Sequence, residues 1–196
     1  MGFAISWVAV KQKETHQVLE LLNLERTGET EEFPESPITC ISISNGWFVV
    51  FANKYNSPLV SAKSLEAISK DCMVISCQVE EHVMVSSATC YANGILSWHV
   101  EHDAQENMYH IASSGNVLPE FNEILKAAKK EQDDDGGEDS EVDYIHDVPI
   151  VLAQTVTSFR HDENMTDENL KSFEVLKLIR SGSKQSTFEK PWWKFW

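Results

Sequence analysis

The residues best suited to chemistry lie in the middle of the chain, where histidines and carboxylates follow strand-like spacing. His99, Glu101 and Asp103 alternate, and alternate side chains of a β-strand share one face of a sheet. We expect His82 and His110 to approach this face from neighbouring segments. Histidine beside carboxylates suits zinc or iron, or a general base oriented by a carboxylate. His99 and Glu101 are therefore the candidate catalytic residues.

One alternative to such a site remains open, and one motif match fails. His99 and Glu101 could simply belong to a solvent-facing sheet surface, where such residues are ordinary. His99-Val100-Glu101 also matches the H-x-E half of a zinc deaminase signature, but no P-C-x-x-C follows it. The sequence therefore assigns no metal ligand and no cofactor.

Other chemical motifs fail on spacing or context. Three His-Asp dipeptides begin at His102, His146 and His161, but the first lies in a strand-like run rather than in the helix that a metal phosphohydrolase would use. Residues 131–142 resemble a calcium loop, yet position twelve is Val142 instead of a bidentate glutamate. No glycine-rich phosphate loop or nucleophile elbow is present.

The end of the chain is unusually aromatic. Four of the last five residues are aromatic, and we assign them as protein-binding: Trp192, Trp193, Phe195 and Trp196. Tryptophan and phenylalanine contribute strongly to protein interfaces, and exposed they would reduce solubility. The segment could dock on the protein's own sheet, on a second copy or on another protein; a membrane anchor this short would hold weakly.

Charge and composition exclude several classes of protein. The net charge is −15, which disfavours nucleic acid and anionic membrane surfaces as partners. Eight acidic residues and no basic residue lie between 131 and 143, a stretch that we interpret as a solvated acidic loop. The four cysteines have no C-x-x-C spacing and lie in apolar runs, which indicates reduced, buried thiols and a cytoplasmic protein. No apolar segment is long enough for a transmembrane helix, and no signal peptide is evident.

Two Asn-Gly pairs predict β-hairpins, because both residues tolerate positive φ in a two-residue turn. At Asn45-Gly46 such a turn would pair Ile43 with Phe48. At Asn93-Gly94 it would pair Thr89 with Trp98, giving an apolar face made of Val83, Val85, Tyr91, Leu96, Trp98 and Val100. The opposite, mixed face would carry Met84, Ser86, Ala88, Cys90, Ser97, His99, Glu101 and Asp103.

Hydrophobic periodicity predicts the other elements. Strands are expected at 3–10, 72–79 and 108–112, and helices at 14–24, 61–70, 118–130 and 148–159, the last capped by Asp147. A last amphipathic segment covers 170–179 and ends at a glycine stop, whereas 25–37 is polar and reads as a surface loop.

Together these elements predict an α+β fold, with a mainly antiparallel sheet built from two Asn-Gly hairpins and helices packed on one face. Residues 1–182 form a single domain that includes the acidic loop, and 183–196 form a C-terminal tail. The predicted function is a non-enzymatic, cytoplasmic module that binds another protein or a second copy, of which an acidic immunity or antitoxin protein would be an example. The alternative is a small metal-dependent hydrolase that uses the His99 and Glu101 face.

Overall fold

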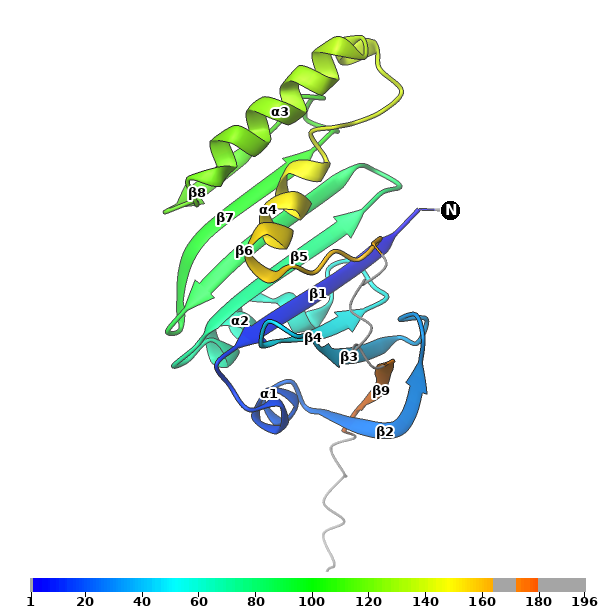
Figure 1. Ribbon diagram of the computed structural model, residues 1–196, viewed down its shortest axis with the longest axis vertical. Coiled ribbons are helices and arrows are strands. Elements are labelled where there is room, and N and C mark those ends of the chain that lie inside the picture. The colour runs from blue at the N-terminus through cyan, green and yellow to red at the C-terminus, as the bar shows by residue number, and fades with distance from the viewer. Residues whose placement is uncertain (1, 164–171, 180–196) are drawn as a thin grey trace, which may run out of the picture.

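A nine-stranded antiparallel sheet forms the centre of this computed structural model, which describes residues 2–163 and 172–179 (Figure 1). The strand order is β2-β9-β3-β4-β1-β5-β6-β7-β8. The strands are β1 (Ala4–Lys11), β2 (Leu24–Glu31), β3 (Ile38–Ser42), β4 (Trp47–Ala52), β5 (Met73–Glu80), β6 (Val85–Ala92), β7 (Ile95–Asp103), β8 (Ala112–Gly115) and β9 (Phe173–Leu178). The helices are α1 (Thr15–Leu21), α2 (Ala62–Ile68), α3 (Glu120–Asp134) and α4 (Asp147–Thr157), with 3₁₀ turns η1 (Pro58–Val60) and η2 (Gly137–Asp139). The predicted α+β class with a mainly antiparallel sheet is confirmed.

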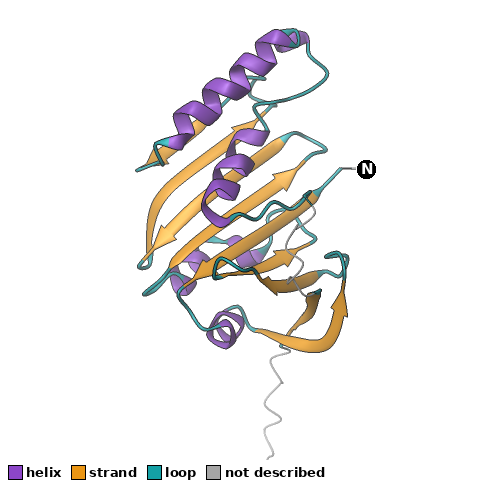
Figure 2. Cartoon of the chain, in the orientation of Figure 1, coloured by secondary structure: helices purple, strands orange, loops and turns teal. Residues whose placement is uncertain are grey.

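The central strands are apolar on both faces, so the sheet needs cover on both sides. In β1, Trp7 and Ala9 belong to one buried cluster, and Val8 and Val10 belong to the other. Helices α3 and α4 contribute to the first cluster, and α1 and α2 contribute to the second (Figure 2). The prediction that helices pack on one face is therefore wrong, because a sheet buried on both faces requires two helical layers.

The turn at Asn45-Gly46 differs from the predicted one. Ile43 pairs with Trp47 through its backbone, and the amide of Gly46 donates to the Ile43 carbonyl at 3.1 Å. Gly46 has φ +86°, so the connection is a three-residue loop with glycine in the left-handed region. The register therefore moves by one residue, and Phe48 lies opposite Ser42 rather than Ile43.

The turn at Asn93-Gly94 has both central residues at positive φ, +53° and +79°, as a two-residue type I′ turn requires. The pairs nearest the turn are as predicted, with Tyr91 opposite Leu96. The register then shifts, so that Cys90 faces Trp98 and Ser97 is the extra residue of a β-bulge.

The bulge changes which residues share a face. Trp98 and Val100 enter the core beneath α4 together with Ala88 and Cys90, whereas Tyr91 packs on the opposite side of the sheet. The predicted apolar face is thus wrong as a set, because one inserted residue moves every following side chain to the other face.

Two predictions at the end of the sheet are also wrong. Residues 25–31 belong to strand β2 rather than to a loop, and the segment before Arg180 contains strand β9 rather than a helix. The two strands pair with each other, with Leu24 opposite Leu178. Both are short amphipathic or polar stretches whose strand conformation depends on a partner about 150 residues away.

Smaller corrections concern the region from residue 108 to the start of α4. The last strand of this region is β8, which begins at Ala112 instead of spanning 108–112. Asp147 is the first residue of α4 and does not cap it; the preceding His146 makes no capping bond through its side chain.

The predicted acidic loop 131–143 is partly helical. Helix α3 continues to Asp134, so the first acidic residues lie in its last turn. The rest is held by the buried Gln132, whose amide group donates to the carbonyls of Gly137 and Val142 at 2.8 and 3.1 Å. Its carbonyl oxygen accepts from the Tyr144 amide at 2.9 Å. Much of this stretch is therefore ordered by a buried amide.

None of the described helices is long and apolar enough to cross a membrane. The predicted tail 183–196 lies outside the described residues.

Candidate functional site: an acidic aromatic pocket

His99 and Glu101 lie side by side on β7, as predicted. His99 Nε2 is 3.6 Å from Glu101 Oε2, and its Nδ1 pairs with Thr89 Oγ1 at 2.8 Å. Both side chains are partly exposed on the sheet face opposite Trp98. The bulge places Thr89 across from His99 and Ser87 across from Glu101.

The structure adds no third ligand to this pair. His82 pairs with Glu80 at 2.7 Å, and His110 accepts a hydrogen bond from the Asp103 amide at 2.9 Å. Within residues 2–163 and 172–179, no group of three or more His, Cys, Asp or Glu side chains is arranged to hold a metal ion. The metal-dependent hydrolase stays a prediction to which the described geometry adds no support.

A buried polar cluster lies on the other side of the same strand. His102 is fully buried, and its Nε2 donates to Asp143 Oδ2 at 2.9 Å. Its Nδ1 faces the His110 carbonyl at 2.7 Å. Burial by itself would raise the pKa of Asp143, but hydrogen bonding to His102, the charge of His102 and the His146 amide hold that pKa below its ordinary value. Because His102 is fully buried and the Asp143 side chain is only 5% exposed, we assign the cluster a structural role.

The four cysteines are free and buried, in agreement with the sequence interpretation. Burial raises the pKa of the Cys40 thiol to about 12 and that of Cys90 to about 11. Thiols held protonated in this way are poor nucleophiles.

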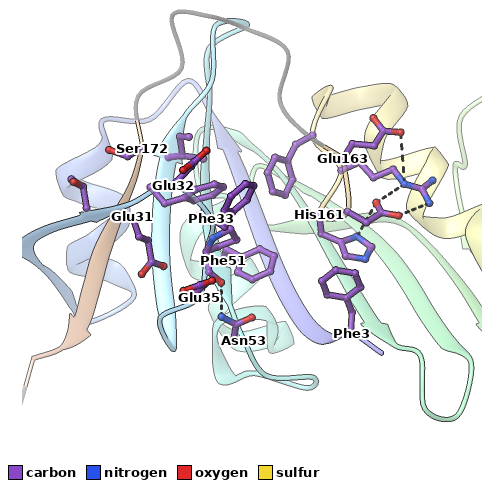
Figure 3. A pocket seen from close by; sticks show the side chains of 17 residues that line it. Phe3, Glu31, Glu32, Phe33, Glu35, Phe51, Asn53, His161, Glu163 and Ser172 are labelled. Atoms are coloured by element: carbon purple, nitrogen blue, oxygen red, sulfur yellow. Dashed lines mark hydrogen bonds and ion pairs between the residues drawn. The ribbon is translucent and has the colours of Figure 1, made fainter. Parts of the chain in front are cut away.

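A pocket of about 890 Å³ opens near the first residue of β9, at the edge of the sheet that contains β2. Its walls come from the β2–β3 loop, from the N-terminal segment before β1 and from residues 159–163 after α4. Figure 3 shows Glu31, Glu32 and Phe33 on one side and Phe3, His161 and Glu163 on the other. These walls come from segments far apart in the sequence: Phe3 contacts His161 directly, and the β2–β3 loop is placed by the pairing of β2 with β9.

The pocket combines phenyl rings with carboxylates. Phe51, Phe159 and Phe173 are buried beneath it, whereas Phe3 and Phe33 are 40% and 54% exposed. The acidic lining residues are Glu31, Glu32, Glu35, Asp162 and Glu163. Exposed phenyl rings among negative charges present an apolar surface in a field that attracts cations.

The loop that carries Phe33 is held in place by hydrogen bonds. Glu31 accepts from the amide and the hydroxyl of Ser36 at 2.9 and 2.8 Å. Asn53 on the chain after β4 donates to the carbonyls of Pro34 and Ser36 at 2.6 and 2.8 Å. Phe33 and its flanking glutamates are therefore presented on an anchored loop rather than on a free one.

The basic lining residue Arg160 is already neutralised. Its guanidinium lies 2.9 Å from Asp147 and 2.7 Å from Asp162, and 3.9 Å from Glu163. Hydrogen bonding to Asp162 is the largest cause that raises the pKa of Arg160, so its charge is permanent. Five carboxylates against one guanidinium leave the pocket strongly negative.

His161 supplies the pocket wall with unpaired nitrogen atoms. Its side chain is 1% exposed, and neither ring nitrogen has a hydrogen-bond partner among the described residues. The ring contacts Phe3 edge to face at 4.9 Å between centroids. Burial lowers the pKa of His161, so at neutral pH the ring is uncharged and one nitrogen is a free acceptor.

The arrangement is suited to binding a cation attached to an apolar or aromatic body. Carboxylates would pair with ammonium or guanidinium groups, the phenyl rings would pack against the body, and His161 would accept one hydrogen bond. The pocket was not predicted, because residues 25–37 were interpreted as a surface loop. A lone Phe33 between Glu32 and Pro34 was the one signal in that stretch.

The predicted protein-binding residues Trp192, Trp193, Phe195 and Trp196 lie outside the described residues. The chain matches no known protein family, no curated protein and no solved structure.

Proposed function

We propose that this protein is a non-enzymatic, cytoplasmic interaction module that binds a basic segment with aromatic side chains through the acidic aromatic pocket. The partner class is protein, either another chain or a second copy, rather than nucleic acid or membrane. An acidic immunity or antitoxin protein that neutralises a basic partner is one example of such a module.

One observation carries the proposal: exposed phenyl rings and unpaired carboxylates share the same pocket. Glu32 and Glu35 have no ion-pair partner among the described residues, and Phe33 between them is more than half exposed. A phenyl ring that is exposed to solvent, as Phe33 is, adds little to the stability of the fold. Both features favour a ligand that is cationic and aromatic at once.

Overall charge supports the same class of partner. A net charge of −15 attracts a basic protein over distances of about a Debye length, roughly 10 Å at 0.1 M salt. Such attraction raises the rate of association more than the final affinity. The pocket would then provide the specific contacts.

The test is an array of 14-residue peptides in which the number of lysines and the number of aromatic residues vary independently. Binding to the full chain is measured by fluorescence anisotropy. We expect binding only when both kinds of residue are present, and a several-fold loss of affinity when salt is raised from about 50 to 300 mM.

The matched variants remove the same number of charges from two places. Glu32→Gln/Phe33→Ala/Glu35→Gln alters the pocket, and Glu20→Gln/Glu66→Gln/Ile95→Ala alters exposed residues on α1, α2 and β7. The first should abolish binding of the basic aromatic peptides and the second should leave it intact. Equal binding by both variants, or equal binding of acidic aromatic peptides, would overturn the proposal.

A further inference from the structure

We propose that the segment of this chain comprising residues 183–196 binds intramolecularly in the acidic aromatic pocket and competes there with outside partners. The inference rests on the proposed function, because it names an occupant of the class that the pocket would bind.

The chemical composition of this segment complements the pocket. Residues 183–196 contain three lysines and one glutamate, in a chain whose remaining residues carry a net charge of −17. They also contain five aromatic residues: Phe188, Trp192, Trp193, Phe195 and Trp196. The most basic and aromatic stretch of the protein thus belongs to the same chain as a pocket lined by five carboxylates and five phenylalanines.

His161 adds a specific polar contact to this match. An indole N–H is a donor only, and a neutral imidazole with a free nitrogen is an acceptor. Both nitrogens of His161 lack partners among the described residues although the side chain is buried, which is costly unless a donor arrives. A tryptophan from the segment would satisfy one of them, as a lysine would satisfy Glu32 or Glu35.

The chain is long enough to reach the pocket. Strand β9 begins at Phe173 in the pocket lining and ends near Asn23, where the Ile179 amide donates to the Asn23 carbonyl at 2.9 Å. To return from the end of β9 to the pocket at Phe173, the chain must cover the length of this six-residue strand, which is about 20 Å at 3.3 Å per residue. The twelve residues between Ile179 and Trp192 span up to roughly 40 Å when extended.

Tethering makes this occupant difficult to displace. A segment joined to its site through a short stretch of the same chain acts at an effective concentration of up to about millimolar. A partner that is only weakly basic and aromatic would therefore be excluded, and only one of higher affinity would enter. The tail would raise the selectivity of the module without adding a contact to the partner.

The experiment titrates a labelled peptide with the sequence of residues 183–196 into two full-length proteins. One is the natural chain, and the other carries Trp192→Ser, Trp193→Ser, Phe195→Ser and Trp196→Ser. We expect the second protein to bind the peptide at least about tenfold more tightly, because its pocket is free. Adding Glu32→Gln/Phe33→Ala/Glu35→Gln to it should abolish binding, and adding Glu20→Gln/Glu66→Gln/Ile95→Ala should not.

The other possible results distinguish failure of this inference from failure of the proposed function. Equal, pocket-dependent binding by both proteins would overturn intramolecular occupancy and leave the proposed function intact. Intramolecular occupancy would also be overturned if the variant with four serines bound other basic aromatic peptides but not the peptide of residues 183–196. A dimer in sedimentation equilibrium that requires the four aromatic residues would replace the intramolecular occupant by a second copy. Failure of every basic aromatic peptide to bind through the pocket would overturn both.

Discussion

Asp143 and His102 form the most fully enclosed charge contact described in this molecule. Both ring nitrogens of His102 lie within hydrogen-bond distance of oxygen atoms, the Asp143 carboxylate and the His110 carbonyl. Asp143 also accepts from the His146 amide at 3.0 Å, which links strand β7 to the start of α4. The acidic stretch is thus anchored at its last residue.

Replacing Asp143 by asparagine should destabilise the protein by about 3–5 kcal/mol, because a buried charge loses its partner. Urea denaturation at pH 7 measures the loss, and Asp139→Asn, which alters an exposed carboxylate of the same stretch, should change stability by less than about 0.5 kcal/mol. Since the folded-state pKa of Asp143 is lowered, its contribution is present above its unfolded pKa and lost as pH falls through the folded value. The difference between natural protein and variant should therefore shrink toward acid pH; a constant difference would contradict the pairing.

His161 gives a second prediction that depends on pH. Its folded-state pKa is lowered, so the unfolded chain takes up a proton near pH 6.5 while the folded chain does not. Stability should fall as the pH drops from about 7 to 5, and His161→Phe should remove part of that fall while keeping the contact with Phe3. Urea midpoints at several pH values test this. An unchanged pH profile would show that His161 does not contribute to it.

At the scale of elements, the β7 bulge and the end of β8 depend on each other. Gly115 has φ +77°, and a Cβ there would lie 2.1 Å from the carbonyl oxygen of Ser97, the bulged residue. The same carbonyl accepts from the Asn116 amide at 2.9 Å. The close approach of the two strands at this point thus requires a residue without a side chain.

Gly115→Ala should therefore cost more than the roughly 1–2 kcal/mol expected for alanine at positive φ alone. Gly46→Ala is the matched control, because Gly46 also has positive φ but an alanine Cβ at this position would meet no described atom within 4 Å. Thermal denaturation of both variants measures the difference. Equal losses would contradict the steric argument.

The local sequence pattern was sufficient to predict some helices and strands but not others. The runs that became β1, β5, α2 and α4 have apolar periodicity strong enough to predict them within a few residues. Strands β2 and β9 lack it, because each is stabilised by the other across the sheet. The pocket was unpredictable for a related reason: Phe33, His161 and Phe173 line it from three segments far apart in the sequence. The pair His99 and Glu101 was placed correctly because it depends on alternation within a single strand.

At the scale of the whole molecule, one sheet separates two hydrophobic clusters. Ile68 of α2 belongs to one cluster and Ile150 of α4 to the other, and both are buried. A layer of strands lies between the two helical layers (Figure 2). The clusters share no helix among the described elements, and the central strand β1 contributes alternate residues to both.

This separation predicts additive energetics. Ile68→Val and Ile150→Val should each cost about 0.5–1.5 kcal/mol, and the double variant should equal their sum within about 0.5 kcal/mol. Urea denaturation of the natural protein and the three variants completes this double-mutant cycle. A coupling above about 1 kcal/mol would mean that strain passes through the sheet from one cluster to the other.

The position of β9 between β2 and β3 has a consequence for synthesis of the chain. Thr39 pairs with Val175, so a ribosome must add more than a hundred residues after β3 before this part of the sheet can close. Until then the nascent chain exposes the free backbone edge of β3 and leaves β2 without its partner, which is the condition in which strands associate with other chains. The strand order therefore predicts that this edge stays open to other chains until the residues around Val175 have been synthesised.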